Sequence, residues 1–160
     1  MAIFCERYFR KVLLANDEYK AKNYKKALEE TFVELDYMLI NDEGFEKMKE
    51  IVLELIKPDT IDDKEIRGIP FGAGCTSCVV LVTKDKIICA NSGDSRAVVG
   101  LKNGKLIELS YDHKPDNDGE LKRVKAGGGF VEDGRVQGVI AVSRAIGDWE
   151  YKEPSLLKSL

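Results

Sequence analysis

Apolar side chains recur every three or four residues through the first third of the chain, a spacing that places them on one face of an α-helix. Three stripes of this kind occur: Phe4, Tyr8 and Val12; Leu28, Phe32, Leu35 and Leu39; and Phe45, Met48, Val52 and Leu55. None persists long enough for a coiled coil. We therefore expect three helices whose apolar faces pack into a core.

Polar and helix-breaking residues mark the ends of these helices. Asn16-Asp17 is predicted to end the first helix, and Asn23 is placed to cap the second. The apolar phase breaks over residues 41–44, and Lys57-Pro58 is predicted to stop the third helix. Residues 57–74 then form a polar connection.

Beyond residue 74 the pattern changes to short apolar runs separated by turn residues, which indicates antiparallel strands. Residues 77–82 are almost continuously apolar, so we expect a strand buried on both faces, with residues 87–90 returning beside it. Two more hairpins are predicted around Asn103-Gly104 and Asp133-Gly134, because tight hairpin turns prefer these residue pairs. Residues 138–141 are compatible with a further short strand.

One short helix is predicted among the strands. Asn117 and Glu120 have the spacing of a capping box, and Gly127 suits the position after a helix end, which brackets a helix over roughly residues 118–126. Only Gly44 and Gly68 of the 14 glycines precede residue 71. This imbalance supports a helical first part followed by strands and tight turns.

Composition and charge narrow the class of protein. The chain has 160 residues, 44% of them hydrophobic, and a net charge of −3, so it is neither disordered as a whole nor a nucleic-acid protein held by bulk positive charge. No apolar run approaches the roughly 20 residues that span a bilayer. Its first residues, Met1 to Arg7, lack the apolar run of a secretory signal. We expect a cytoplasmic, or alternatively nuclear, protein with reduced cysteines, no nucleic-acid partner and no membrane association.

Several motifs are candidates for catalysis or ligand binding, but for most of them a structural role is the simpler interpretation. Cys75-x-x-Cys78 has the spacing of a zinc-binding or redox-active motif. Zinc needs about four ligands, so a structural role for these cysteines is favoured, and redox activity or metal binding is the alternative. The glycine-rich run at residues 72–77 enters a strand rather than a helix, which disfavours phosphate binding. His113, the sole histidine, lacks a nucleophile with a triad signature and is expected to be structural.

Asp94 is the most informative candidate. It lies in Gly93-Asp94-Ser95-Arg96, directly after an apolar strand, where its carboxylate can project into a cleft. Mg²⁺ and Mn²⁺ prefer such oxygen ligands on rigid strand ends. The alternative is a turn acid that pairs with Arg96 or binds backbone N–H groups. The residues alone leave both interpretations open.

Several segments of the chain, taken together, resemble the motifs of a known family. The segments concerned are Gly74-Cys75-Thr76, residues 90–98, residues 109–115 with Glu120 and Arg123, Ala126-Gly127-Gly128, Gly134-Arg135-Val136, residues 141–148 and Tyr151-Lys152. In their order and spacing they resemble the protein phosphatase 2C class, and residues 3–56 resemble the two long helices of that class.

The resemblance implies a fold and an activity. It implies an α+β fold, part of an α/β sandwich of antiparallel sheets flanked by long helices and incomplete at both ends. It implies metal-dependent hydrolysis of phosphoserine and phosphothreonine in phosphorylated protein substrates, at a binuclear Mg²⁺ or Mn²⁺ centre. The alternative is a non-catalytic pseudophosphatase that acts as an interaction module.

The resemblance also implies site residues. The core metal carboxylates of the family, in Asp-Gly-His-Gly-Gly, Asp-Gly-x-Trp-Asp and a later Asp-Asn pair, have no counterpart here. We therefore expect a fragment that is inactive alone, and no catalytic residue is assigned. Asp94 matches an additional, weaker metal position. Arg96 and Arg144 match family arginines expected to be structural, and residues 130–150 match a mobile flap.

These expectations give one partial phosphatase-like domain over residues 1–160, whose oligomeric state is left open. Its predicted parts are a helical portion at 1–56, a connection at 57–74, antiparallel strands at 75–111, and a short helix with the flap region at 112–152.

Overall fold

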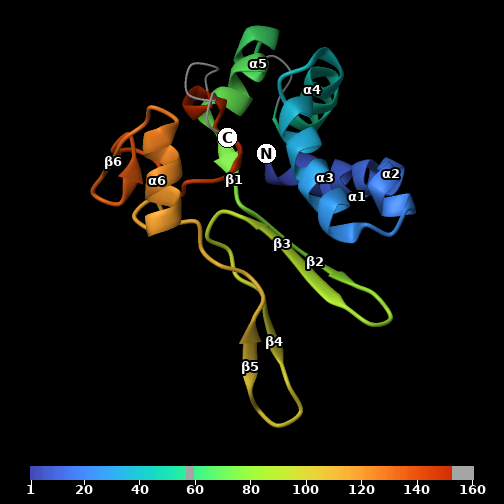
Figure 1. Cartoon of the computed structure of the whole chain (residues 1–160). Coiled ribbons are helices and arrows are strands. Elements are labelled where there is room, and N and C mark those ends of the chain that lie inside the picture. Colours follow the sequence, from blue (N-terminus) through green and yellow to red (C-terminus); the bar gives the residue numbers. More distant parts are fainter. Residues whose placement is uncertain (57–59, 153–160) are drawn as a thin grey trace. The chain divides into compact units, whose positions relative to one another are not determined.

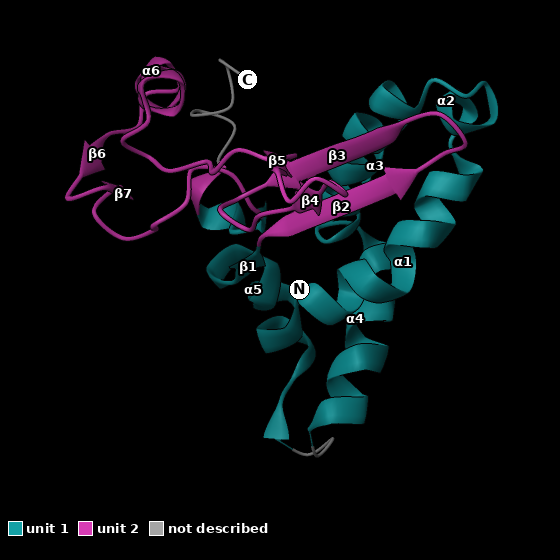
Figure 2. Ribbon diagram, turned by 90° about the horizontal axis from the view of Figure 1, so that it is seen from below, with its two compact units in different colours: residues 1–75, 146–150 teal, residues 76–145, 151–160 magenta. Residues whose placement is uncertain are grey.

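The computed structural model describes residues 1–56 and 60–152. Contacts within the chain divide it into two compact units (Figure 2). Unit 1 comprises residues 1–75 and 146–150, and unit 2 comprises residues 76–145 with the segment that starts at Tyr151. The predicted α+β class is confirmed, since helices and small antiparallel sheets both occur. The single domain predicted over residues 1–160 stays a prediction.

Unit 1 is mainly helical (Figure 1). Its helices are α1 (Ala2–Ala15), α2 (Asp17–Lys20), α3 (Tyr24–Met38), α4 (Asp42–Leu55) and α5 (Asp63–Gly72). The three helices expected from the apolar stripes are confirmed as α1, α3 and α4. Lys57-Pro58, predicted to end the third helix, lies outside the described residues.

The apolar stripes meet in one core. Its buried members are Phe4, Leu35, Met38, Leu39, Phe45, Met48, Ile51, Val52, Ile66 and Ile146. Burying side chains of this size stabilises a fold by about 1.5–3 kcal/mol each relative to leaving them exposed. This common burial holds α1, α3, α4 and α5 together.

Two short helices in unit 1 were not expected. The first, α2, has four residues, and the Asn16 side chain caps it by accepting a hydrogen bond from the Tyr19 N–H. The second, α5, lies within the predicted polar connection. Asp62 and Glu65 cap it with a reciprocal capping box, and Ile66 packs in the core. The connection at residues 57–74 is therefore partly helical.

A late segment of the chain completes unit 1. Strand β1 (Gly74–Cys75) pairs antiparallel with β8 (Ile146–Gly147), so that Cys75 lies opposite Ile146. The Asp36 carboxylate of α3 accepts a hydrogen bond from the Gly147 N–H at 2.7 Å. The Asp36 carbonyl accepts another from the Trp149 indole, at the start of the short 3₁₀ helix η2 (Trp149–Tyr151). These contacts hold the returning segment against α3.

Within its described residues, unit 2 consists mainly of hairpins and helix α6 (Asp118–Ala126). Strands β2 (Ser77–Val82) and β3 (Ile87–Ser92) pair antiparallel along their whole length. Strands β4 (Val98–Gly100) and β5 (Leu106–Glu108) form the hairpin predicted at Asn103-Gly104. Helix α6 precedes β6 (Val131–Glu132) and β7 (Arg135–Val136), the hairpin predicted at Asp133-Gly134.

Three local expectations in unit 2 are wrong. The strand at 77–82 is not buried on both faces, because β3 is its one partner among the described strands and Val82 stays 68% exposed. Residues 138–141 form only an isolated bridge from Ile140 to Val136. Glu120 does not join Asn117 in a capping box, because the Asn117 side chain donates to the Asp112 carbonyl instead.

No helix in the described ranges is long and apolar enough to cross a membrane.

Candidate functional site

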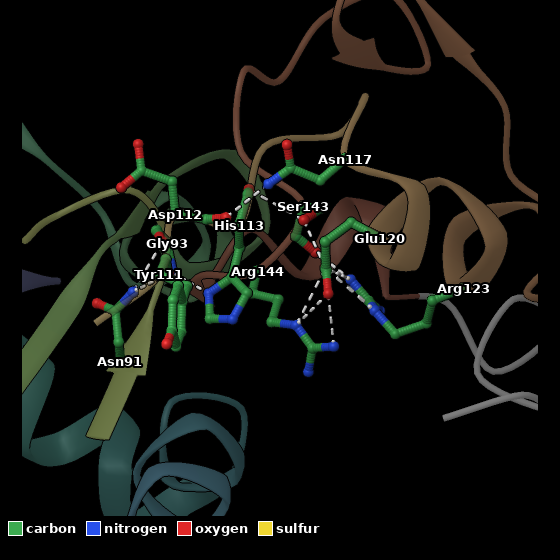
Figure 3. Close-up of polar contacts among 10 residues, drawn as sticks. All are labelled: Asn91, Gly93, Tyr111, Asp112, His113, Asn117, Glu120, Arg123, Ser143 and Arg144. Atoms are coloured by element: carbon green, nitrogen blue, oxygen red, sulfur yellow. Dashed lines mark hydrogen bonds and ion pairs between the residues drawn. The ribbon is translucent and has the colours of Figure 1, made fainter. Parts of the chain in front are cut away.

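The candidate site lies in unit 2, where the turn after β3 approaches the segment between β5 and α6 (Figure 3). Gly93 makes the approach possible. Its φ of +105° suits glycine, and a Cβ added there would lie 2.4 Å from Cγ2 of Thr76. The Gly93 N–H and carbonyl both bond to His113, and the Thr76 and Ser95 hydroxyls are 2.7 Å apart. The turn that carries Asp94 is therefore fixed at both sides.

Asp94 forms an ion pair with Lys114, not with Arg96. The side chains of Asp94 and Lys114 are 31% and 42% exposed. The Asp94 carboxylate is thus paired with a cation and partly exposed to water. Pairing of Asp94 with Arg96 is therefore wrong, because its partner is Lys114. The other interpretations left open by the sequence, binding of backbone N–H groups and of a metal ion, stay predictions.

Arg96 binds a different carboxylate. Its Nε and Nη2 donate to the two Asp112 oxygens at 2.7 and 2.9 Å, a bidentate ion pair between the turn after β3 and the segment after β5. The hydrogen bonds from Arg96 lower the pKa of the Asp112 carboxyl. This geometry agrees with the structural role expected for Arg96.

His113 is a hydrogen-bonded structural residue. Its Nδ1 accepts from the Gly93 N–H at 3.1 Å, which leaves the proton of the neutral ring on Nε2. Its carbonyl accepts from the N–H and hydroxyl of Ser143. Partial burial, followed by the nearby Arg144 cation, lowers the pKa of the imidazole. The ring is therefore neutral near pH 7 and acts as an acceptor.

Asn91 links the same segments through backbone carbonyls. Its side-chain amide donates to the Gly93 carbonyl at 3.1 Å and to the Tyr111 carbonyl at 2.8 Å. Its Oδ1 is buried and has no hydrogen-bond partner within the described part of the chain. The amide thus cross-links the strand end to the segment before His113 (Figure 3).

Glu120 of α6 is the centre of a polar cluster (Figure 3). Arg144 donates to it from Nε at 3.0 Å and from Nη2 at 2.7 Å, Arg123 donates at 2.9 Å, and the Ser143 hydroxyl at 2.6 Å. Burial by itself raises the pKa of Glu120, but these three partners outweigh burial and lower it to about 2. The cluster attaches α6 to the segment at Ser143-Arg144.

The carboxylates of the candidate site are paired with basic side chains. Asp94, Asp112 and Glu120 each face a cation from another part of the sequence or from the next helical turn. Among the described residues, no group of three or more His, Cys, Asp or Glu side chains is placed to hold a metal ion. The residues present therefore do not fit a binuclear metal centre by themselves. Asp94 is a partly exposed carboxylate paired with the Lys114 ammonium, and its role as a metal ligand stays a prediction.

Sequence reasoning identified part of this site. It singled out Asp94, His113, Arg96 and Arg144, and the structure brings the segments that carry them together. It missed Lys114 as the partner of Asp94, for which the sequence carries no local signal. The Glu120–Arg123 pair has the i,i+3 spacing of a helical ion pair and could have been found that way.

Unit 1 contains a separate open groove of about 900 Å³ between α1, α3 and α4. Its lining mixes apolar side chains, such as Tyr8 and Val33, with carboxylates and the lysines Lys11 and Lys47. The groove has no arrangement of nucleophile and base, so it is not the candidate site.

Comparisons with known proteins agree on one family. A family model described as protein phosphatase 2C matches residues 4–158. "Probable protein phosphatase 2C 6" and "Probable protein phosphatase 2C 5" of Paramecium tetraurelia are each 42% identical over 158 residues, covering 99% of this chain and 49% of each relative. "Protein phosphatase 2C homolog 2" of Aspergillus flavus is 37% identical over 153 residues, covering 96% of this chain and 30% of the relative.

The chain belongs to the protein phosphatase 2C family, as the resemblance of its motifs predicted. It spans about half the length of the curated Paramecium relatives it matches.

Proposed function

We propose that this chain is part of a metal-dependent protein serine/threonine phosphatase. The reaction is hydrolysis of phosphoserine and phosphothreonine in protein substrates, supported by Mg²⁺ or Mn²⁺. The family match over residues 4–158 carries the proposal. A cytoplasmic or nuclear location stays an expectation from the sequence.

Within that function the described residues divide into two roles. The ion pairs of Glu120 and Asp112 are structural, because they fix the segments on either side of His113. Asp94 is the candidate ligand of an additional metal ion, which would bind the carboxylate after the Lys114 ammonium has moved away. A binuclear centre needs further carboxylates, so the 160-residue chain alone should have little or no phosphatase activity.

A phosphopeptide assay tests the activity of the chain itself. The purified 160-residue chain, incubated with a phosphothreonine peptide and Mn²⁺, should release inorganic phosphate no faster than buffer containing Mn²⁺. Asp94→Ala should behave like the wild-type chain. Robust Mn²⁺-dependent release that Asp94→Ala abolishes would contradict our assignment of the missing ligands.

Sequencing the gene on both sides of these residues tests the family function. Carboxylate motifs of the type Asp-Gly-His-Gly-Gly and Asp-Gly-x-Trp-Asp in the same reading frame favour the phosphatase, and the product of that whole frame should then show Mn²⁺-dependent release. A frame without these motifs, whose product lacks activity, favours the non-catalytic interaction module.

A further inference from the structure

Two cysteines of unit 1 meet although 70 positions separate them in the sequence. The Sγ atoms of Cys5, in the first turns of α1, and Cys75, in β1, are 3.9 Å apart. The sequence pattern had directed attention to Cys75-x-x-Cys78 and offered no partner for Cys5. The structure instead pairs Cys75 with Cys5.

The protein core holds both thiols in place. Cys5 and Cys75 are partly buried and pack against the cluster that contains Phe4 and Ile146. Ile146 is the residue opposite Cys75 in the β1–β8 pair. A disulfide has an S–S length of about 2.0 Å, so the two sulfur atoms must approach by roughly 2 Å. Side-chain rotation can supply much of this movement, since each sulfur lies one bond beyond a rotatable Cα–Cβ bond.

The contact also shifts the pKa values of the two thiols in opposite directions. The hydrogen bond between the two thiols lowers the pKa of Cys75 to about 7, whereas the same hydrogen bond and burial raise the pKa of Cys5. Burial of Cys75 and the charges of Asp148 and Asp36 oppose the lowering, and the N-terminal ammonium adds to it. Of the two thiols, Cys75 is therefore the one that loses its proton more readily to give the thiolate, the reactive form of cysteine.

We propose that Cys5 and Cys75 are a site of oxidative modification, at which a hydroperoxide such as hydrogen peroxide converts the two thiols into an intramolecular disulfide. The Cys75 thiolate attacks one peroxide oxygen, the O–O bond breaks, and hydroxide leaves, which gives Cys75 sulfenic acid. The Cys5 sulfur then attacks the Cys75 sulfur. The S–O bond breaks as the S–S bond forms, and the Cys5 proton leaves with the hydroxide as water.

The sum of these steps is balanced. Two thiols and one hydrogen peroxide give one disulfide and two waters, and two electrons pass from sulfur to oxygen. A dithiol reductant reverses the modification by thiol–disulfide exchange. The disulfide would join the first turns of α1 to the β1–β8 pair and close a long loop that includes α3, α4 and α5, which constrains the unfolded chain. This inference does not depend on the proposed function.

Unit 2 provides an internal comparison. The Sγ atoms of Cys78 and Cys89 are also 3.9 Å apart. However, Cys78 lies opposite Asn91 and Cys89 opposite Val80, so the two cysteines are diagonal neighbours in a fixed register. Diagonal neighbours are about 7–8 Å apart, beyond the usual Cα separation of a disulfide. Burial, with the hydrogen bond to Cys78, raises the pKa of Cys89 to about 11.

Mass spectrometry of the native chain tests the proposal. The reduced wild-type chain is treated with hydrogen peroxide at pH 7, free thiols are alkylated, and the digested peptides are quantified over time. The Cys5–Cys75 linked peptide should appear with the loss of two hydrogen atoms and disappear on dithiol reduction. It should form at least about ten times faster than a Cys78–Cys89 link.

Variants separate the two steps. Cys5→Ser should stop the reaction at Cys75 sulfenic acid, which a 1,3-dione reagent traps, and Cys75→Ser should leave Cys5 unoxidised. The double variant Cys78→Ser/Cys89→Ser is the matched control and should form the Cys5–Cys75 link at the wild-type rate. A wild-type chain that forms no Cys5–Cys75 link, or forms the Cys78–Cys89 link as fast, would overturn the proposal.

Discussion

Glu120 shows how a single carboxylate can hold a region that has little apolar core. It is 8% exposed and accepts hydrogen bonds from Arg144, Arg123 and Ser143. Removing one member of such a group leaves the others unpaired in a partly dry environment. We predict that Glu120→Gln lowers the free energy of unfolding of unit 2 by about 2–3 kcal/mol. Hydrogen exchange of the α6 amides, measured against urea concentration, gives this quantity.

The contribution of Glu120 should depend on pH with a definite sign. Its pKa is lowered in the folded chain from 4.5 to about 2, so its stabilisation is complete above pH 4.5 and is lost as the pH falls towards 2. The difference between the wild type and Glu120→Gln should therefore shrink over that window. Glu108→Gln, at an exposed position of β5, is the control and should show no such change. A difference that stays constant down to pH 2 would disprove this account of the cluster.

The Asp94–Lys114 pair leads to a prediction about metal binding. Because the lysine ammonium occupies the carboxylate, removing it should free a ligand for Mn²⁺. Exposed ion pairs are worth about 0.2–1 kcal/mol, so Lys114→Met should tighten Mn²⁺ binding by roughly 1.4- to fivefold. Asp94→Asn should abolish this binding, and Lys84→Met, at a surface turn, should leave it unchanged. Titration of Mn²⁺ followed by water-proton relaxation measures the affinity, and equal binding by the wild type and Lys114→Met would argue against Asp94 as a ligand.

The residue pairs of the site could be predicted only where they are local. The three-residue spacing of Glu120 and Arg123 on α6 is visible in the sequence. Three other pairs join positions 16 to 24 residues apart: Asp94–Lys114, Arg96–Asp112 and Arg144–Glu120. At such separations the sequence offers each of these basic residues several possible carboxylate partners. Tertiary contacts choose among them, so pattern and propensity could not.

At the scale of elements, two asparagines that each precede a helix differ in whether their side chains cap it. Asn41 precedes α4, and its side chain accepts a hydrogen bond from the Gly44 N–H at 2.7 Å. Asn23 precedes α3 but makes no such bond. We predict that Asn41→Ala lowers the free energy of unfolding of unit 1 by about 1 kcal/mol and that Asn23→Ala lowers it by less. Fluorescence of Trp149, the single tryptophan, reports unfolding in urea. Equal losses for the two variants would show that the cap geometry is not what stabilises α4.

Elements with strong periodicity or turn signals were predictable, and the others were not. The apolar stripes gave α1, α3 and α4, and the Asn-Gly and Asp-Gly pairs gave two hairpins. Helix α5 was missed because Pro70, Gly68 and Gly72 lower helix propensity within it. It forms because the Asp62–Glu65 capping box starts it and Ile66 is buried in the core. Burial against other helices outweighs the local propensity there.

At the scale of the whole chain, apolar burial is unevenly shared. Within the described ranges, the buried side chains of the apolar core belong to unit 1, whereas the buried groups of unit 2 include Pro115, Ser110 and Glu120. The strands of unit 2 leave large apolar side chains in contact with water, among them Val82 at 68% and Leu106 at 71% exposed. The described sheets have two strands each, so one edge of each strand lacks a strand partner, apart from the single bridge between Val136 and Ile140. Such edges pair readily with other chains.

We therefore predict that the 160-residue chain self-associates with increasing concentration. Val82→Lys places a charge on the exposed face of β2, and charged side chains on edge strands oppose intermolecular pairing, so this variant should stay monomeric to higher concentration. Leu55→Lys is the matched control, because Leu55 is 61% exposed but lies on α4. Sedimentation velocity over a concentration series distinguishes the two. If Leu55→Lys suppresses association as well as Val82→Lys does, general surface hydrophobicity rather than the strand edge is responsible, and a wild-type chain that is monomeric throughout would contradict the prediction altogether.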